Sequence, residues 1–294
     1  MFHKDYKELG ARKKIGQQCL NPQSKSLVAL RLDHGASSYE VDHINQLSEQ
    51  LNLPIVKDDE SAADFLFFLM YSNERLSLKD LSQPKIKPIC VDFVHGKVDH
   101  RRRFGGGQGQ MIAKAVGVSG RFHPHVLDTT AGLGGDGFVL ACLNCQLTLL
   151  ERNPIVHALL NDGLERARHC DQTDIQAIIE NMQLLPIDAI EHLQALKSHP
   201  GQHATSGYDV IYIDPMFPER KKSAAVKKEM QFFHQLVGAD SDQAQLLSSA
   251  IKAAKYRAVV KRPRLAETIG GISPSYQLMG KTSRYDIYVN QKIP

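Results

Sequence analysis

The chain has 294 residues, of which 42% are hydrophobic and 23% are charged, a composition that supplies a large buried core. Its longest apolar run covers only residues 65–71. That is far short of the roughly 20 residues that cross a membrane, so a transmembrane helix is excluded and a buried strand is expected. The net charge is only +4, but residues 217–264 carry 11 basic and four acidic side chains, an excess that suits a polyanionic partner.

The N-terminus is polar and lacks an apolar export signal, and the five cysteines are an odd number. Reduced thiols and a cytoplasmic location are therefore expected. Cys142 and Cys145 have the spacing of half a metal site, but no second pair follows. We interpret them as buried structural thiols and predict no metal.

The first part of the chain contains short apolar runs separated by polar stretches, at residues 27–30, 51–56 and 65–71. Residues 89–94 alternate enough to predict a further strand. Three arginines and three glycines follow at residues 101–107, a pattern typical of a hinge. We therefore predict an N-terminal α/β domain over residues 1–104 and a second domain over residues 105–294.

The second domain alternates strand and helix patterns. Helices are predicted at residues 110–116 and 138–143 and from Pro154 onward, where proline suits the first helical turn. Short apolar strands are predicted at residues 126–128, 147–150, 208–214, 258–261 and 285–289. This order predicts an α/β fold with a mainly parallel sheet, in which ligands bind at the carboxyl ends of the strands.

A glycine-rich loop follows the strand that ends at Asp128. The glycines at 132, 134 and 137 have the spacing found in nicotinamide-dinucleotide enzymes, and Glu151 follows the first by 19 residues. Asp128 and three further residues precede the first glycine, however, as they do in methyltransferase loops. Asp136 would also disfavour a pyrophosphate at the helix N-terminus. Glu151 is placed to bind ribose hydroxyls, and Asp188 is interpreted either as an adenine ligand or as a helix N-cap.

The segment Asp214-Pro-Met-Phe-Pro218 directly follows an apolar strand. It is similar to the Asp-Pro-Pro-Tyr signature of methyltransferases that act on amino groups of flat rings. The Asp214 carboxylate and a carbonyl near Pro215 can accept the two N–H bonds of such an amine, while Phe217 can stack on the base. Asp214, Pro215 and Phe217 are therefore the predicted catalytic residues.

Together, residues 128–136, 150–154, 214–218 and 227–230 resemble the bacterial 16S ribosomal RNA guanine-N2 methyltransferase family called RsmJ, as do residues 91–94, 100–107 and 113–117. The resemblance covers about residues 89–288. It implies a Rossmann-like, seven-stranded class I methyltransferase domain that uses S-adenosylmethionine, with a smaller N-terminal α/β domain. The loop analysis and the resemblance together give these cofactor contacts: Asp128, Gly132, Gly134, Gly135, Asp136, Glu151, Arg152, Asp188, Ala189 and Asp214.

The resemblance also implies 16S rRNA or the small ribosomal subunit as partner, with a possible RNA-binding role for the N-terminal domain. The basic residues expected to contact RNA are Arg101, Arg102, Arg103, Lys221, Lys222, Lys227, Lys228, Lys261 and Arg262. Three alternatives stay open on the residues alone. They are an amino-methyltransferase acting on DNA adenine or another RNA, a nicotinamide-dependent oxidoreductase, and a catalytically silent RNA-binding protein.

Overall fold

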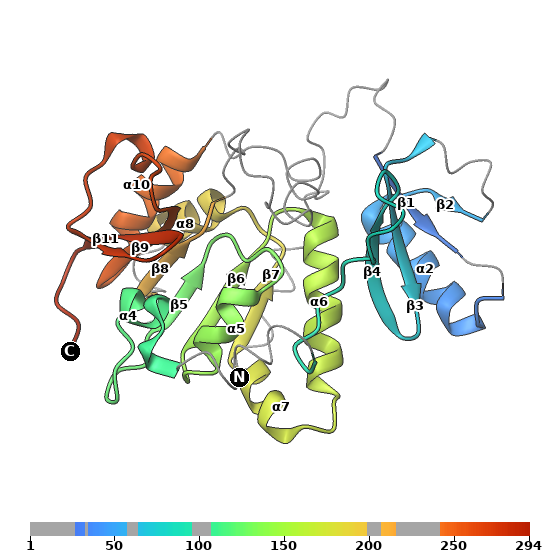
Figure 1. Ribbon diagram of the computed structural model, residues 1–294, viewed down its shortest axis with the longest axis horizontal. Helices are drawn as coiled ribbons and strands as arrows, with labels where there is room; N and C mark the ends of the chain where they lie inside the picture. Colours follow the sequence, from blue (N-terminus) through green and yellow to red (C-terminus); the bar gives the residue numbers. More distant parts are fainter. Residues whose placement is uncertain (1–26, 33–34, 58–63, 96–106, 199–206, 216–241) are drawn as a thin grey trace.

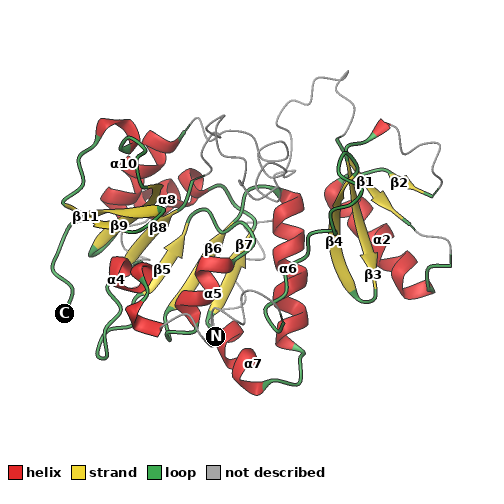
Figure 2. Ribbon diagram, in the orientation of Figure 1, coloured by secondary structure: helices red, strands yellow, loops and turns green. Residues whose placement is uncertain are grey.

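The computed structural model describes residues 27–32, 35–57, 64–95, 107–198, 207–215 and 242–294. Two sheets organise this part of the chain (Figures 1 and 2). The predicted fold class, a seven-stranded Rossmann-like domain with a smaller N-terminal α/β part, is confirmed. The predicted boundary between residues 104 and 105 lies outside the described residues. No helix among the described residues is both long enough and apolar enough to cross a membrane.

The small sheet has the strand order β2-β1-β3-β4. Its strands are β1 (Val28–Arg31), β2 (Ile55–Val56), β3 (Phe67–Ser72) and β4 (Arg75–Asp80), and only the β3–β4 pair is antiparallel. Helix α2 (Ser38–Leu51) connects β1 to β2 and begins with a capping box, in which Ser37 and Glu40 bond each other's backbone N–H groups. Residues 67–71 of the apolar run lie in the largely buried strand β3, as predicted, whereas residues 65 and 66 precede it.

The large sheet has the order β10-β11-β9-β8-β5-β6-β7. Strands β5 to β9 are parallel, whereas β11 is antiparallel to both of its neighbours. The bounds are β5 (His125–Asp128), β6 (Gln146–Leu150), β7 (Met182–Leu185), β8 (Val210–Ile213), β9 (Arg257–Pro263), β10 (Tyr276–Met279) and β11 (Ser283–Val289). The chain order reverses at β5, and a crevice for ligands forms at such a switch point.

Helices cover both faces of the large sheet (Figure 1). One face packs against α4 (Met111–Val116), α5 (Gly135–Ala141), α6 (Pro154–Arg168) and α7 (Thr173–Glu180). The other face packs against α8 (Ala189–Ser198) and α10 (Gln243–Ala253), and short 3-10 helices lie at η2 (Gly107–Gly109) and η3 (Ile269–Gly271). The predicted start of α6 is confirmed, because the Asn153 side chain accepts hydrogen bonds from the N–H groups of Ile155 and Val156.

The strand predicted at residues 89–94 is wrong. Only Ile89 makes a single bridge, to Leu78 of β4, and the rest of the segment crosses from the small sheet to the large domain. Its alternating side chains are buried because Val91 packs against α6 and Phe93 stacks on Phe138 of α5, with ring centroids 4.9 Å apart. The alternation therefore reflects two buried contacts rather than strand pairing.

Gly163 on α6 makes this crossing possible. A methyl carbon at Gly163 would lie 2.4 Å from Cγ1 of Val91 and 3.2 Å from its carbonyl oxygen. Gly163→Ala is expected to lower the free energy of unfolding by about 1–3 kcal/mol, because overpacking at the backbone outweighs the ~1 kcal/mol that alanine gains in a helix. Urea unfolding measures this effect. Gly120→Ala is the control, because its methyl group would enter open space; equal losses in the two variants would contradict the tight contact.

Candidate active site

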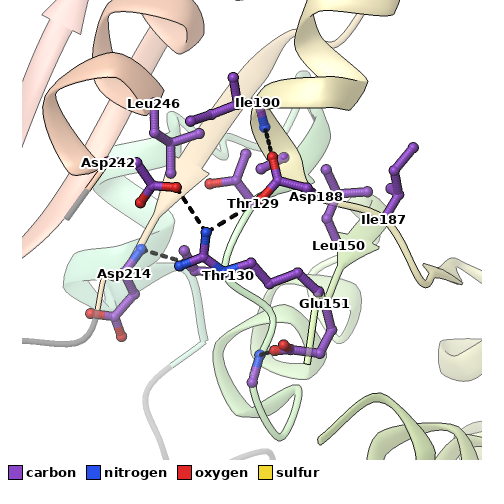
Figure 3. Close-up of a pocket in the computed structure, with 13 residues that line it drawn as sticks. Thr129, Thr130, Leu150, Glu151, Ile187, Asp188, Ile190, Asp214, Asp242 and Leu246 are labelled. Carbon is purple, nitrogen blue, oxygen red and sulfur yellow. Dashed lines mark hydrogen bonds and ion pairs between the residues drawn. The ribbon is translucent and has the colours of Figure 1, made fainter. Parts of the chain in front are cut away.

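A pocket opens at the carboxyl ends of β5, β6 and β8 (Figure 3). It encloses about 600 Å³, counting the open solvent at its mouth. Apolar and polar side chains both line it. Its lining consists of Thr129, Thr130, Gly132, Leu150, Glu151, Arg152, Ile187, Asp188, Ala189, Ile190, Asp214, Asp242 and Leu246.

The glycine-rich loop after β5 forms one wall. Gly132 and Gly134 have φ angles of +55° and +75°, in the left-handed region that favours glycine. At Gly134 a methyl carbon would also lie 2.7 Å from Leu160 and 3.1 Å from the ring of Phe93. The packing therefore requires glycine at Gly134 and the backbone angle favours it at Gly132, and α5 begins immediately after Gly134.

Glu151 follows β6 and is held by two backbone N–H groups. Its Oε2 accepts a hydrogen bond from Gly132 at 3.0 Å (Figure 3), and its Oε1 accepts one from Asn153 at 2.7 Å. The residue is only 8% exposed, yet it lines the pocket. Each carboxylate oxygen has a second lone pair, so the side chain can accept further hydrogen bonds from a ligand.

Arg152 and Asp188 lie across the pocket from the glycine-rich loop. An Nη1 atom of Arg152 is 2.8 Å from Asp242 and 3.3 Å from Asp188. Asp188 also caps α8, because its Oδ1 accepts from the N–H groups of Ile190 and Glu191. The N-cap interpretation of Asp188 is therefore confirmed, and the same residue still faces the pocket.

Asp214 directly follows β8. Its backbone N–H donates to Oγ1 of Thr130 at 2.7 Å, which fixes the start of the Asp-Pro segment against the glycine-rich loop (Figure 3). Pro215 is buried, and the Asp214 side chain is 35% exposed. Burial raises the pKa of Asp214, and the adjacent ammonium of Lys261 opposes that rise.

Three carboxyl groups surround Lys261 and form an acidic cluster with it. The Lys261 Nζ is 2.7 Å from Oδ2 of Asp136 and 2.8 Å from Oδ2 of Asp214. Asp136 also accepts a 2.7 Å hydrogen bond from the hydroxyl of Tyr212. Asp128 lies beneath them, 2% exposed, and burial together with the nearby carboxylates raises its pKa to about 7. The cluster has more negative than positive groups, so it favours a cationic ligand.

The structure brings six of the predicted cofactor residues to the pocket: Gly132, Glu151, Arg152, Asp188, Ala189 and Asp214. Gly134, Gly135, Asp136 and Asp128 lie in or under the adjoining loop without lining it. The sequence interpretation missed Asp242 and Leu246, which reach the pocket from the start of α10 and carry no motif.

Phe217 and the predicted RNA contacts at Arg101, Arg102, Arg103, Lys221, Lys222, Lys227 and Lys228 lie outside the described residues. Lys261 and Arg262 are described, and both contact groups of the protein itself. Lys261 is bound to two carboxylates, and Arg262 is 7% exposed and donates to the carbonyl of Glu267.

The described residues contain no cluster of three metal-ligating side chains. Cys145 is fully buried, and burial raises the pKa of its thiol to about 12. Cys142 is half-buried. Cys145 belongs to the hydrophobic core on the α5 side of the sheet, and Cys142 packs against that core.

Comparison with known proteins places this site in a family. Residues 46–290 match the family model described as "Putative SAM-dependent methyltransferase". The chain is 49% identical over 253 residues to ribosomal RNA small subunit methyltransferase J of Cellvibrio japonicus, covering 84% of this chain and 93% of the relative. It is 51% identical over 228 residues to the protein of the same name from Colwellia psychrerythraea, covering 78% and 80%.

The crystal structure of a SAM-dependent methyltransferase from Neisseria gonorrhoeae is similar as well. It shares 33% identity and a TM-score of 0.66 with this chain, over 89% of this chain and 95% of that one. The glycine-rich loop, Glu151 and Asp214 thus occur on a fold shared with a SAM-dependent enzyme. The chain belongs to the S-adenosylmethionine-dependent methyltransferase family that includes the ribosomal RNA small subunit methyltransferases J.

Proposed function

We propose that this protein transfers a methyl group from S-adenosylmethionine to the exocyclic N2 of one guanine in 16S rRNA. The observation that carries the proposal is the position of Asp214. It ends β8 beside the pocket, with its backbone anchored to Thr130 and its carboxylate partly open to solvent. A carboxylate there can accept an N–H bond from an amine brought alongside the cofactor.

The residues of the pocket fit S-adenosylmethionine. Glu151 offers carboxylate lone pairs for the ribose hydroxyls, and Asp188 can accept from the adenine amino group. Leu150, Ile187 and Leu246 supply apolar contacts for the adenine ring. The excess of carboxylates around Lys261 suits a ligand that carries a positive charge. When bound, the cofactor supplies an electrophilic methyl group on a sulfonium sulfur.

The chain's own residues prepare the amine. The guanine amino nitrogen is a poor nucleophile because its lone pair is delocalised into the ring. The Asp214 carboxylate and a backbone carbonyl near Pro215 accept hydrogen bonds from its two N–H groups. These bonds localise the lone pair on the nitrogen and direct it toward the methyl group. Phe217 is proposed to stack on the base, which requires the base to be flipped out of any helix it occupies.

Family membership excludes the nicotinamide-dependent alternative, and the intact Glu151 and Asp214 argue against a silent RNA-binding protein. The names of the relatives support a small-subunit rRNA substrate. The choice of guanine N2 depends on the sequence resemblance. We further propose a cytoplasmic protein with an N-terminal domain over residues 1–104 that helps to bind RNA. The arginines at 101–103 and the lysines at 221–222 and 227–228 would contact phosphates.

The proposal is tested by transfer of labelled methyl from S-adenosylmethionine to unmodified 16S rRNA and to small subunits, followed by nucleoside mass mapping. One N2-methylguanosine at a single position is expected. N6-methyladenosine as product would contradict the guanine assignment. Transfer to DNA or tRNA without transfer to rRNA or subunits would overturn the substrate assignment.

A further inference from the structure

Three neighbouring strands of the large sheet direct a charged residue to the same face. Side chains alternate between faces along a strand. Val126, Tyr212 and Val259 belong to the core on the α5 side, whereas Leu127, Ile213 and Val260 belong to the core on the α8 and α10 side. The next residues along the three strands therefore return to the α5 side. These residues are Asp128, Asp214 and Lys261.

The register of the sheet places Lys261 level with Asp214. Val260 of β9 pairs with Ile213 of β8, so the residue that follows each of them lies at the same height. The Nζ atom reaches 2.8 Å from Asp214 and 2.7 Å from Asp136, at the start of α5. One ammonium group thus joins the predicted catalytic segment to the helix that follows the glycine-rich loop.

We propose that Lys261 is a positioning residue for methyl transfer, which holds the Asp214 carboxylate ionised and directed toward the target amine rather than binding an RNA phosphate. This proposal rests on the function proposed above. The ion pair with Lys261 engages Oδ2 of Asp214. Among the described residues no hydrogen bond or ion pair engages its Oδ1, which is the oxygen that would accept from the amine.

The electrostatic surroundings explain why the lysine is needed. Burial raises the pKa of Asp214, and a carboxyl that takes up a proton can no longer accept both the lysine and the amine. Burial by itself would lower the pKa of Lys261, but its two carboxylate partners outweigh burial and raise it above the ordinary value. The titratable groups that face this centre are Asp128 of β5, Asp136 of α5, Tyr212 of β8, Asp214 and Tyr285 of β11.

The test uses Lys261→Met, which keeps an unbranched side chain of similar size but removes the charge, and Lys261→Arg, which keeps the charge. Lys255→Met is the matched control, because Lys255 pairs with Asp209 at 3.7 Å at the opposite end of the same sheet. For each variant, kcat and KM for methyl transfer are measured from pH 5 to 9. The thermal midpoint of the cofactor-free protein is measured over the same range.

Lys261→Met is expected to shift the acidic limb of the pH profile upward by about one unit and to lower kcat about tenfold at pH values below that limb. This follows because each unit of rise in the pKa of Asp214 costs tenfold in its ionised fraction below that pKa. Lys261→Arg is expected to have the same acidic limb in its kcat–pH profile as the wild-type protein. KM for the cofactor changes less than kcat, and Lys255→Met matches the wild type.

The melts need no RNA. Without the lysine, the folded-state pKa of Asp214 rises further above its unfolded value, so the variant loses stability relative to the wild type as the pH rises from the unfolded pKa toward the folded one. The difference in thermal midpoint between wild type and Lys261→Met should therefore widen from pH 5 to 9.

If the difference in thermal midpoint between wild type and Lys261→Met stayed constant with pH, and the kcat profile of the variant were unshifted, the proposal would be overturned and Lys261 would have only a packing role. An unshifted profile in Lys261→Met with a normal melt, together with loss of rRNA binding, would return Lys261 to a phosphate contact and overturn it as well. If the difference in thermal midpoint widened with pH but the wild-type protein did not methylate rRNA, the ion pairs of Lys261 would be supported and only the proposed function would be contradicted.

Discussion

Replacing Asp214 with alanine is expected to lower kcat for methyl transfer about 10²- to 10³-fold, the loss that follows removal of one preorganised polar group in an active site. Among the described residues that line the pocket, Asp214 is the charged hydrogen-bond acceptor at the end of β8. Its loss leaves the amine with a delocalised lone pair. Single-turnover measurements with saturating cofactor separate this chemical step from binding.

Asp214→Asn gives a second measurement of the same site. The amide keeps the shape and one acceptor oxygen but has no charge to attract Lys261, so its kcat should lie between those of wild type and Asp214→Ala. Asp171→Ala removes an exposed carboxylate before α7 and serves as the control. If Asp214→Ala kept kcat within about threefold of the Asp171 variant, the catalytic assignment of Asp214 would be wrong.

Strands and loops that carry the cofactor site could be predicted from the sequence because each signal is local. A short apolar run followed by Asp128, Glu151 or Asp214 marks the carboxyl end of a parallel strand, and those ends meet at one edge of the sheet. The glycines of the loop likewise predict the positive φ angles found at Gly132 and Gly134. Local chemistry and tertiary structure agree at these positions.

The strand expected at residues 89–94 failed for a physical reason. Alternation shows that every second side chain is buried, but not which backbone lies alongside. Val91 packs against Gly163 and Phe93 against Phe138, two helical residues far along the chain. A crossing segment between two packed bodies gives the same pattern as an edge strand.

The roles of basic residues were also beyond local interpretation. Lys261 and Arg262 belong to a run of charge that suggested RNA contact. Lys261 instead meets Asp136, which is distant in sequence, and Arg262 donates to the nearby carbonyl of Glu267. Alternation along β9 held a usable signal, because Lys261 follows Val259 by two residues and so shares its buried face. The carboxylates at Asp136 and Asp214 that meet it become visible only once the strand order is known.

Replacing Glu151 is expected to have the largest effect on cofactor affinity. Each hydrogen bond to a charged group contributes about 1.5–3 kcal/mol, so losing two bonds to the ribose in Glu151→Ala should weaken S-adenosylmethionine binding by about 10²- to 10⁴-fold. The same change releases the N–H groups of Gly132 and Asn153 and loosens the loop. Calorimetric titration with S-adenosylmethionine and with S-adenosylhomocysteine, which shares the ribose, should show similar losses.

Glu151→Gln distinguishes a charge effect from a geometric one. In the structure both carboxylate oxygens accept from backbone N–H groups, Oε2 from Gly132 and Oε1 from Asn153. An amide has one acceptor and one NH₂ group, so in either orientation a donor faces one of these donors. Glutamine should therefore lose much of the affinity despite its matching shape, whereas Glu180→Ala, at the exposed end of α7, should lose none. If Glu151→Gln bound S-adenosylmethionine with wild-type affinity, the proposed role of the Glu151 carboxylate in holding the loop and the ribose would be wrong.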